Sequence, residues 1–141
     1  MKVLMDAPSL EQFIDRVFPA AREFGFVIDR ADADGVQVSL PINAGHLRPG
    51  GTISGPTLMT LADTAMYLAV LSRVGPEALA VTTSLNMNFL RRPQASRIVC
   101  TCRLLKLGKR LAVGDTLIHC EGQPDPVAQA TVTYSIPPAR A

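Results

Sequence analysis

The sequence predicts an α+β domain in which a mostly antiparallel sheet of about five or six strands wraps around one long buried helix. Two observations carry this prediction. Residues 54–71, SGPTLMTLADTAMYLAVL, are apolar around all sides of a helix rather than along one stripe, so this helix needs cover on every side. The chain after residue 75 then offers four strand-like segments and no second helix.

The chain fits a single domain over residues 1–141, of which 1–25 form an N-terminal helical segment. Its 141 residues are 48% hydrophobic and 18% charged, which is enough apolar material for a core and excludes a disordered chain. The formal net charge of +2 is too small to indicate nucleic-acid binding. The apolar run at the N-terminus is too short for a signal peptide, and polar residues interrupt the long helix, so we expect a cytoplasmic protein without a membrane span.

The N-terminal segment predicts an amphipathic helix from Ser9 to Phe24. Apolar residues recur there at spacings of three and four, Ser9 is a suitable N-cap, and Gly25 ends the pattern. A hairpin follows, with strands over 26–30 and 36–42 around a DADG turn. The segment NAGHLRPGG then predicts a loop that leads into the long helix.

Four strands are expected after the long helix, over residues 80–90, 97–107, 111–121 and 126–136. The short LGK and GQPD segments supply tight turns of an antiparallel meander. Cys100 and Cys102 share one face of a strand and Cys120 is left over, which predicts small buried side chains rather than a disulfide framework. We expect no metal site.

Asp63 is the single charge in the apolar helix. An ionised carboxylate is costly to bury without partners, so Asp63 must be paired, protonated or placed at a polar cleft. One interpretation is a structural carboxylate that bonds to Thr60, Thr64 or a neighbouring strand. The other is a catalytic base or nucleophile whose pKa is set by partial burial.

The start of the same helix offers a complementary feature. Ser54 is placed at the N-cap with Gly55 just inside, so free backbone N–H groups and the positive end of the helix dipole face outward. Gly55 lets a ligand oxygen approach closely. Gly55 and Asp63 lie about 12 Å apart along the helix. One carbonyl group cannot contact both, so joint action requires Asp63 from the antiparallel helix of a second subunit.

Basic residues concentrate in one window of the sequence. Seven of the fourteen lie between Arg91 and Arg110, where there is no Asp or Glu, which predicts an anion-attracting surface. No aromatic residues are interleaved with them, so base stacking with a nucleic acid is not supported.

The order of motifs between Asn43 and Pro137 resembles the PaaI-type hotdog-fold acyl-CoA thioesterases. These motifs are LADTAM eight residues beyond the helix-starting glycine, then AVTTSLNMNFLRRP, a strand pair joined by KLGKR, and VAQATVTYSIP. The resemblance implies a long helix wrapped by an antiparallel sheet, a homodimer with one continuous sheet and sites at its interface, and a dimer of dimers. It also implies an acyl-CoA substrate, so coenzyme A is part of the substrate and no separate cofactor is expected.

The resemblance further implies roles for individual residues. Asp63 takes the position of the catalytic acid, as nucleophile or general base, and Gly55 that of the N–H that polarises the thioester carbonyl. Thr83 takes the position of a Ser or Thr that orients the water or the carboxylate across the subunit boundary. The positions expected to contact the substrate are Ser54, Asn43, His46, Arg48, Arg91, Arg92, Lys109 and Arg110, with the alternative that His46 is a surface side chain.

This chain has Ser54-Gly55-Pro56 where that family usually has His-Gly-Gly. The donor glycine is kept and the imidazole is lost, so three functions stay open: an acyl-CoA thioesterase, a non-catalytic acyl-CoA binding protein, and a hotdog-fold hydratase or dehydratase. The last would need a His beside Asp63, and none lies within ten residues of it. Six apolar side chains are expected either to line the acyl pocket or to form core: Leu58, Met59, Leu61, Ala62, Leu85 and Met87.

Overall fold

A computed structural model describes residues 2–138 of the chain. Two helical elements come first, α1 (Ala7–Val17) and the 3-10 helix η1 (Pro19–Phe24). The remaining elements are β1 (Val27–Asp32), β2 (Gly35–Pro41), the 3-10 helix η2 (Ala44–His46), α2 (Gly55–Val74), β3 (Val81–Phe89), β4 (Arg97–Leu107), β5 (Leu111–Cys120) and β6 (Pro126–Ser135).

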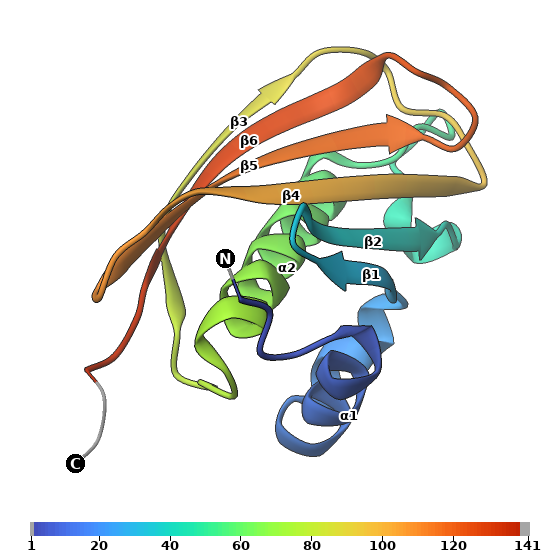
Figure 1. The fold of residues 1–141 in the computed structure, drawn as a ribbon. Helices are drawn as coiled ribbons and strands as arrows, with labels where there is room; N and C mark the ends of the chain where they lie inside the picture. Colours follow the sequence, from blue (N-terminus) through green and yellow to red (C-terminus); the bar gives the residue numbers. More distant parts are fainter. Residues whose placement is uncertain (1, 139–141) are drawn as a thin grey trace.

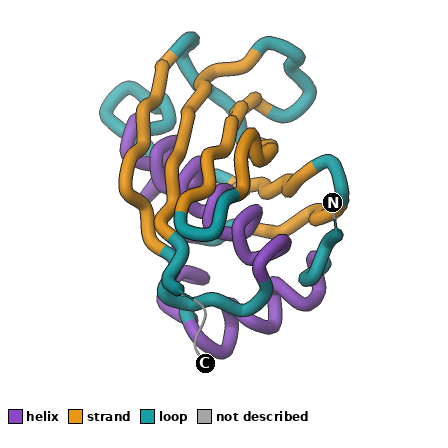
Figure 2. Tube along the Cα trace, turned by 60° about the vertical axis from the view of Figure 1, so that its left-hand side comes forward, coloured by secondary structure: helices purple, strands orange, loops and turns teal. Residues whose placement is uncertain are grey.

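The strands form one antiparallel sheet of six in the order β1-β2-β4-β5-β6-β3. The sheet curves around α2, and α1 lies beside the β1 end (Figure 1). A second view shows the strands covering one side of the long helix (Figure 2). The meander is confirmed for β4, β5 and β6, whereas β3 crosses to the far edge and pairs with β6. This is the hotdog architecture that the resemblance implies.

The long helix begins at the predicted N-cap and continues three residues beyond the predicted 54–71, to Val74. Ser54 Oγ accepts the Thr57 N–H at 3.2 Å, and the helix stops at Gly75, whose φ is +91°. Most of its side chains are buried against the sheet, and at Gly114 of β5 an added Cβ would collide with Met66 Sδ. No helix among residues 2–138 combines the length and hydropathy needed to cross a membrane.

One face of α2 is left open, contrary to the expectation of cover on every side. Gly55, Met59 and Asp63 are spaced by four residues and therefore share a helix face. This face runs along the edge strand β3, since Gly55 lies against Phe89 and Asp63 bonds to Thr82. Met59 is 41% exposed there, although it is surrounded in sequence by core residues. The other predicted apolar residues of this helix, Leu58, Leu61 and Ala62, are fully buried core.

The N-terminal segment is not one helix from Ser9. Asp6 is the N-cap, and its Oδ1 accepts the Ser9 N–H at 3.0 Å. The α-helix ends after Val17 because Pro19 lacks an N–H and disfavours helical geometry at Phe18, whose φ and ψ are −143° and 56°. The chain continues as η1, which Gly25 ends as predicted with φ +94°.

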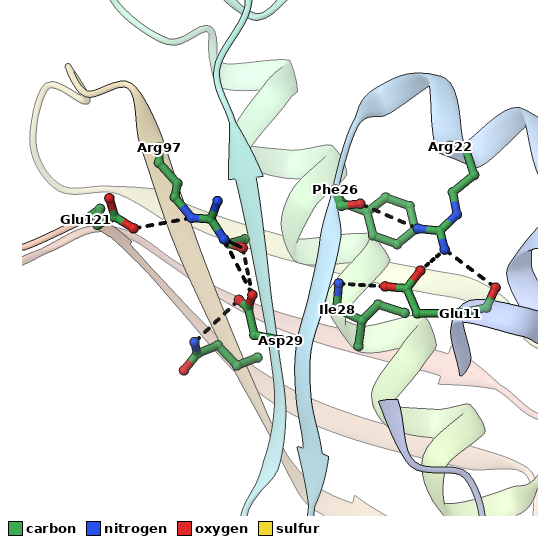
Figure 3. A network of polar contacts seen from close by, with 9 residues as sticks. Glu11, Arg22, Phe26, Ile28, Asp29, Arg97 and Glu121 are labelled. Carbon is green, nitrogen blue, oxygen red and sulfur yellow. Dashed lines mark hydrogen bonds and ion pairs between the residues drawn. The ribbon is translucent and has the colours of Figure 1, made fainter. Parts of the chain in front are cut away.

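An ion-pair network fastens η1 to α1 and to the sheet (Figure 3). Arg22 of η1 pairs with Glu11 and, at 2.7 Å, with Asp15 of α1. Glu11 Oε1 in turn accepts the Ile28 N–H of β1 at 3.0 Å. The Arg22 guanidinium also lies 5.1 Å from the centre of the Phe26 ring. The N-terminal segment is therefore held against the end of the sheet that β1 forms.

A second network lies on the other side of the β1–β2 hairpin. Arg97 of β4 contacts Asp29 at 3.5 Å, Glu121 at 3.3 Å and Ser39 Oγ at 2.5 Å (Figure 3). These contacts engage the Arg97 guanidinium within the sheet. Arg97 therefore does not add a free positive charge to the basic residues between Arg91 and Arg110. Cys100, Cys102 and Cys120 are buried, as predicted, and burial raises the pKa of the Cys102 thiol to about 12.

Candidate active site

The carboxylate of Asp63 is held by two hydroxyl groups from two strands. Thr82 Oγ1 of β3 donates to Asp63 Oδ1 at 2.5 Å, and the Tyr134 hydroxyl of β6 donates to the same oxygen at 3.0 Å. The bond to a neighbouring strand, foreseen in the structural interpretation of Asp63, is therefore present. Both donors use one carboxylate oxygen, so the arrangement also fixes the direction in which the other oxygen points.

The second oxygen, Oδ2, is open to its surroundings. No hydrogen bond to it is found within residues 2–138. The same residues contain no buried side-chain oxygen or nitrogen that lacks a partner, so Oδ2 is not enclosed by protein. An ionised oxygen that is oriented but unpaired is the arrangement that a general base or a nucleophile needs.

Tyr134 is a permanent donor in this arrangement. Its side chain is only 4% exposed and stacks on Tyr67 with ring centres 6.1 Å apart. Burial first, and then the negative charge of Asp63, raise the pKa of Tyr134 well above its ordinary value. The phenol therefore keeps its proton throughout the pH range in which a carboxyl group titrates.

Asp63 opens into a cavity of about 400 Å³. At its polar end lie Asp63, Thr64 and Thr82 together with the hydroxyls of Tyr67 and Tyr134. The rest of the lining is apolar and comes from the α2–β3 connection and the N-terminal segment, namely Ala78, Ala80, Val81, Ile14, Phe18, Ala21 and Phe26. No histidine lines this cavity. A carboxylate at the end of an apolar pocket suits a substrate with an apolar tail and one reactive polar group.

The N-terminus of α2 forms a second polar feature. Ser54 caps it, and the Thr57 hydroxyl donates to the His46 carbonyl at 3.2 Å, which locks the helix start onto the preceding loop. The Gly55 N–H, at the first helical position, makes no hydrogen bond within the described residues. It is therefore a free donor at the positive end of the helix dipole.

Gly55 lines a separate cavity of about 550 Å³. Arg48 and Arg92 are its charged residues, and Phe89 and the Arg48–Thr52 turn form much of its wall. Gly50 and Gly51 in that turn have φ of +98° and +82°, a backbone shape that glycine allows at little cost. The cavity is thus electropositive and contains a free backbone donor, which suits a carbonyl oxygen or an anion.

The two cavities share no residue and lie at opposite ends of β3. Asp63 contacts Thr82 at the start of this strand, while Gly55 lies 3.5 Å from the ring of Phe89 at its end, measured from an added Cβ. Along α2, Gly55 and Asp63 are eight residues apart, which is about 12 Å. One chain therefore does not bring Gly55 and Asp63 to one carbonyl group, in line with the spacing of the sequence.

Asn43 and His46 are engaged in the loop before α2. Asn43 caps η2, and its Oδ1 accepts the Gly45 N–H at 2.8 Å. His46 is buried rather than on the surface: Nδ1 accepts the Asn43 N–H at 3.0 Å, so Nε2 carries the proton and donates to the Phe24 carbonyl at 2.9 Å. To reach a substrate, the ring would first have to break both bonds.

Thr83 sits at a β-bulge between Thr82 and Ser84. Its hydroxyl donates to the Thr133 carbonyl at 3.3 Å and not to Asp63 of the same chain. Because it is exposed on an edge strand, a role toward a second subunit stays a prediction.

The predicted basic window is divided by the sheet. Arg91 and Arg92 follow β3 at one end, and Arg91 donates to the Pro126 carbonyl at 2.7 Å. Lys109 and Arg110 form the β4–β5 turn. Ser135 pairs with both Leu111 and Val81, so this turn lies at the opposite end of β3, where the strand starts. Within one chain the window does not form a single anion-attracting surface, and that prediction is wrong for the isolated chain.

Two side chains of this site were not foreseen from the sequence, namely Thr82 and Tyr134. The adjacent threonines Thr82 and Thr83 could not be distinguished, because the bulge shifts which of them points toward α2. Tyr134 is one of two tyrosines in the chain and lies in a strand of inward-facing apolar residues. A buried tyrosine needs a partner for its hydroxyl, and this was the available signal.

The fold and these two half-sites define a hotdog protein with a carboxylate and a backbone donor on its central helix. The model of the Thioesterase superfamily matches residues 50–127, more than half of the chain. Among solved structures, one from a Silicibacter species, provisionally described as a thioesterase, is 46% identical, with 98% of this chain and 96% of that chain covered and a TM-score of 0.87.

Two more distant structures agree. A mutant of the phenylacetic acid degradation protein PaaI from Thermus thermophilus is 28% identical, with 84% of this chain and 99% of that chain covered and a TM-score of 0.73. A thioesterase from Haemophilus influenzae shares the fold at 20% identity, covering 94% and 90% with a TM-score of 0.82. None of the curated proteins compared with the chain matches it.

The chain belongs to the thioesterase superfamily and is a PaaI-like hotdog protein of it.

Proposed function

We propose that this protein hydrolyses acyl-CoA thioesters to the free acid and coenzyme A, at two sites formed between two copies of the chain. The observation that carries the proposal is the placement of Asp63 and Gly55 at opposite ends of the edge strand β3. A twofold axis pairs identical edge strands antiparallel, so the start of β3 in one copy meets the end of β3 in the other.

Such pairing joins the two half-sites. With Leu85 at the axis, Thr82 of one copy lies opposite Asn88 of the other. Asp63, bonded to Thr82, then faces the region of Phe89 in the second copy, against which Gly55 of that copy lies. The same rotation brings the Lys109–Arg110 turn of one copy toward the Arg92 end of the other.

The surface along β3 is suited to such pairing. β3 is at the edge of the sheet, and its exposed apolar side chains Val81 and Phe89 are 56% and 55% accessible. Met59 adds to them from the open face of α2, and Leu79 and Leu90 flank the strand, 56% and 48% exposed. An unpaired edge with exposed apolar residues is a template for association with another strand.

The reaction then needs few groups. The thioester carbonyl oxygen accepts the Gly55 N–H of one copy, while Asp63 Oδ2 of the other either removes a proton from water or attacks the carbonyl carbon itself. In the first route the water oxygen bonds to carbon, the oxyanion is held at Gly55, and the C–S bond breaks to release the CoA thiolate. In the second route an acyl-aspartate forms and water hydrolyses it. A thiolate leaves readily, so no strong general acid is needed.

The basic side chains fit the coenzyme A end of the substrate. Arg48 and Arg92 border the cavity that contains Gly55. With the thioester carbonyl at Gly55, the phosphate groups of coenzyme A would lie near these two cations. Lys109 and Arg110 of the second copy would extend this surface. Asn43, His46 and Ser54 support the cavity through the bonds that fix the loop and the helix start, and coenzyme A enters and leaves as part of the substrate.

A non-catalytic acyl-CoA binding protein is the second candidate, because Ser54-Gly55-Pro56 replaces a histidine that the family usually has. A hydratase is disfavoured by the same geometry, since the Asp63 cavity has no histidine and both nitrogens of His46 are occupied.

The test is thiol release from a panel of acyl-CoAs by wild type and Asp63→Asn. The amide is nearly isosteric and its oxygen still accepts from Thr82 and Tyr134, so the fold should be kept. We expect kcat/KM to fall by about 10²-fold or more, because the variant lacks the base or nucleophile. A wild-type protein that binds acyl-CoA but releases no thiol supports the binding protein, and full activity of Asp63→Asn overturns the site.

A further inference from the structure

The Asp63 cavity is lined in part by the N-terminal segment, which lies outside the residues 50–127 that the family model matches. Ile14, Phe18, Ala21 and Phe26 supply much of its apolar surface, whereas the family match begins at residue 50. The chemistry of the site comes from α2, β3 and β6, and the apolar lining comes largely from the N-terminal segment. The two parts of the pocket are therefore built by different regions of the sequence.

The N-terminal segment presents a defined wall rather than a loose cover. Ile14 and Phe26 are 1% and 4% exposed and form the enclosed part of the lining. Phe18 is 49% exposed and stands at the opening, with Ala21 half-buried between these positions in the chain. The Glu11–Arg22 pair and the Glu11–Ile28 bond fix η1 relative to α1 and β1 (Figure 3). These contacts hold the lining residues of the N-terminal segment in place against α1 and β1.

The size of the cavity limits what it can hold. A water molecule in the liquid occupies about 30 Å³ and a methylene group slightly less. A cavity of about 400 Å³ therefore has room for on the order of ten carbon atoms. Its apolar lining has no charged group other than Asp63, so it favours an uncharged acyl tail.

We propose that the N-terminal segment, residues 7–26, determines the acyl specificity of the site, with Ala21 and Phe18 setting the longest chain that it accepts. This inference rests on the proposed function. The acyl group is an apolar chain of medium length, from hexanoyl to decanoyl. Acetyl leaves most of the apolar surface unused, and palmitoyl exceeds the cavity.

The experiment measures kcat/KM of the full-length protein for straight-chain acyl-CoAs from acetyl to palmitoyl. Ala21→Phe fills the cavity, so the ratio of decanoyl-CoA to butyryl-CoA should fall at least about 10-fold, the effect of losing a methylene site in a hydrophobic pocket. Phe18→Ala opens the cavity and should move the optimum toward longer chains. Ala20→Phe, the same change at an exposed neighbour in η1, should leave the profile unchanged.

Dissociation constants of the same acyl-CoAs for the Asp63→Asn protein, and for Ala21→Phe on that background, provide a readout without turnover. The same loss of preference for decanoyl-CoA should appear in binding. An unchanged length profile in both Ala21→Phe and Phe18→Ala, with circular dichroism showing folded proteins, overturns the inference and leaves the proposed function intact. Absence of thiol release with length-dependent binding overturns the thioesterase but keeps the specificity assignment. Two variants of opposite effect on volume also keep the test decisive if one fails to fold.

Discussion

The two ends of the open face of α2 differ in almost every respect. At the Asp63 end, a carboxylate is held by two hydroxyl donors beside an apolar cavity. At the Gly55 end, a backbone N–H lies free among arginines and a glycine-rich turn. The first end can supply a base or nucleophile and an acyl pocket, and the second can supply an oxyanion donor and attraction for phosphates. The proposed reaction needs both ends.

The exposed edge strand β3 runs between the Asp63 end and the Gly55 end. Gly55 and Asp63 of one chain lie about 12 Å apart along α2, too far for one carbonyl group to contact both, and antiparallel pairing of two β3 strands would bring Asp63 of one copy toward Gly55 of the other. In the proposed dimer, the apolar surface along β3 would be buried as the two half-sites meet, so association and assembly of the site would be the same event.

The largest loss of activity is expected from a substitution that prevents two copies of the chain from associating. Met59→Glu places a charge on the open helix face midway between the two half-sites. Met59 is 41% exposed, so the single chain should tolerate the change, whereas a dimer would bury the charge unpaired. We expect a monomer by light scattering and a loss of about 10²-fold or more in kcat/KM, since both half-sites are then incomplete.

Leu105→Glu is the matched control. Leu105 is 56% exposed on β4, away from β3, and receives the same charge. It should keep the oligomeric state and the activity. If Met59→Glu remained fully active as a monomer, assembly of the site across copies would be excluded.

Tyr134→Phe tests the Asp63 end, because it removes one of the two hydroxyl groups that donate to Asp63. The Tyr134 hydroxyl helps to fix the direction in which Oδ2 of Asp63 points, so its loss should lower kcat with little change in KM. We expect about a 10-fold loss in kcat.

A merely structural tyrosine gives a different result. Tyr134→Phe would then lower the thermal midpoint with the kcat of the folded protein unchanged, and Thr82→Ser, which keeps a hydroxyl on Asp63, would behave like wild type in either case.

The smallest effect is expected from removing a charge at the Gly55 end. Arg92→Ala removes one cation from the cavity while leaving the donor in place, so KM should rise about 3-fold to 10-fold with kcat nearly unchanged. Added salt should reduce the difference between variant and wild type, because it screens the attraction. Arg103→Ala, exposed on β4, is the control and should show no such change. A fall in kcat alone would place Arg92 in the chemistry instead.

Much of this was accessible from the sequence. The all-round apolarity of α2 predicted a buried helix, Ser54 marked its start, and the strand positions followed from alternation and turns. Asp63 and Gly55 could be selected because a charge in an apolar helix and a glycine at a helix start are both unusual. The predicted N-terminal helix is too long, because Pro19 forces Phe18 out of helical geometry and ends the α-helix at Val17.

Other features depended on contacts that no local pattern records. The bulge at Thr83 decides that Thr82 reaches Asp63, and the crossing of β3 to the far edge decides that Tyr134 does. The acyl-pocket residues expected in α2 proved to be core or open surface, because the cavity forms where the N-terminal segment meets α2. The loop position of His46 predicts a pocket or surface side chain, whereas two hydrogen bonds make it part of the interior.

The most direct measurement is complementation between two inactive variants, Asp63→Asn and Gly55→Pro. Proline is well tolerated at the first helical position, and Ser54 before it is already extended, with φ −71° and ψ 150°, so Gly55→Pro removes the N–H. Because the new proline precedes Pro56, circular dichroism and the thermal midpoint check that the helix is kept. Each variant alone should lose about 10²-fold or more in activity. The two chains are co-expressed with different tags, and the mixed dimer is isolated through both.

A mixed dimer contains one site in which Asp63 and Gly55 are both intact and one in which both are altered, if the site spans two copies. We therefore predict that the purified mixed dimer recovers about half of the wild-type activity per dimer. A mixed dimer as inactive as its two parents would contradict the account, because it would show that Asp63 and Gly55 do not act on one substrate across the interface.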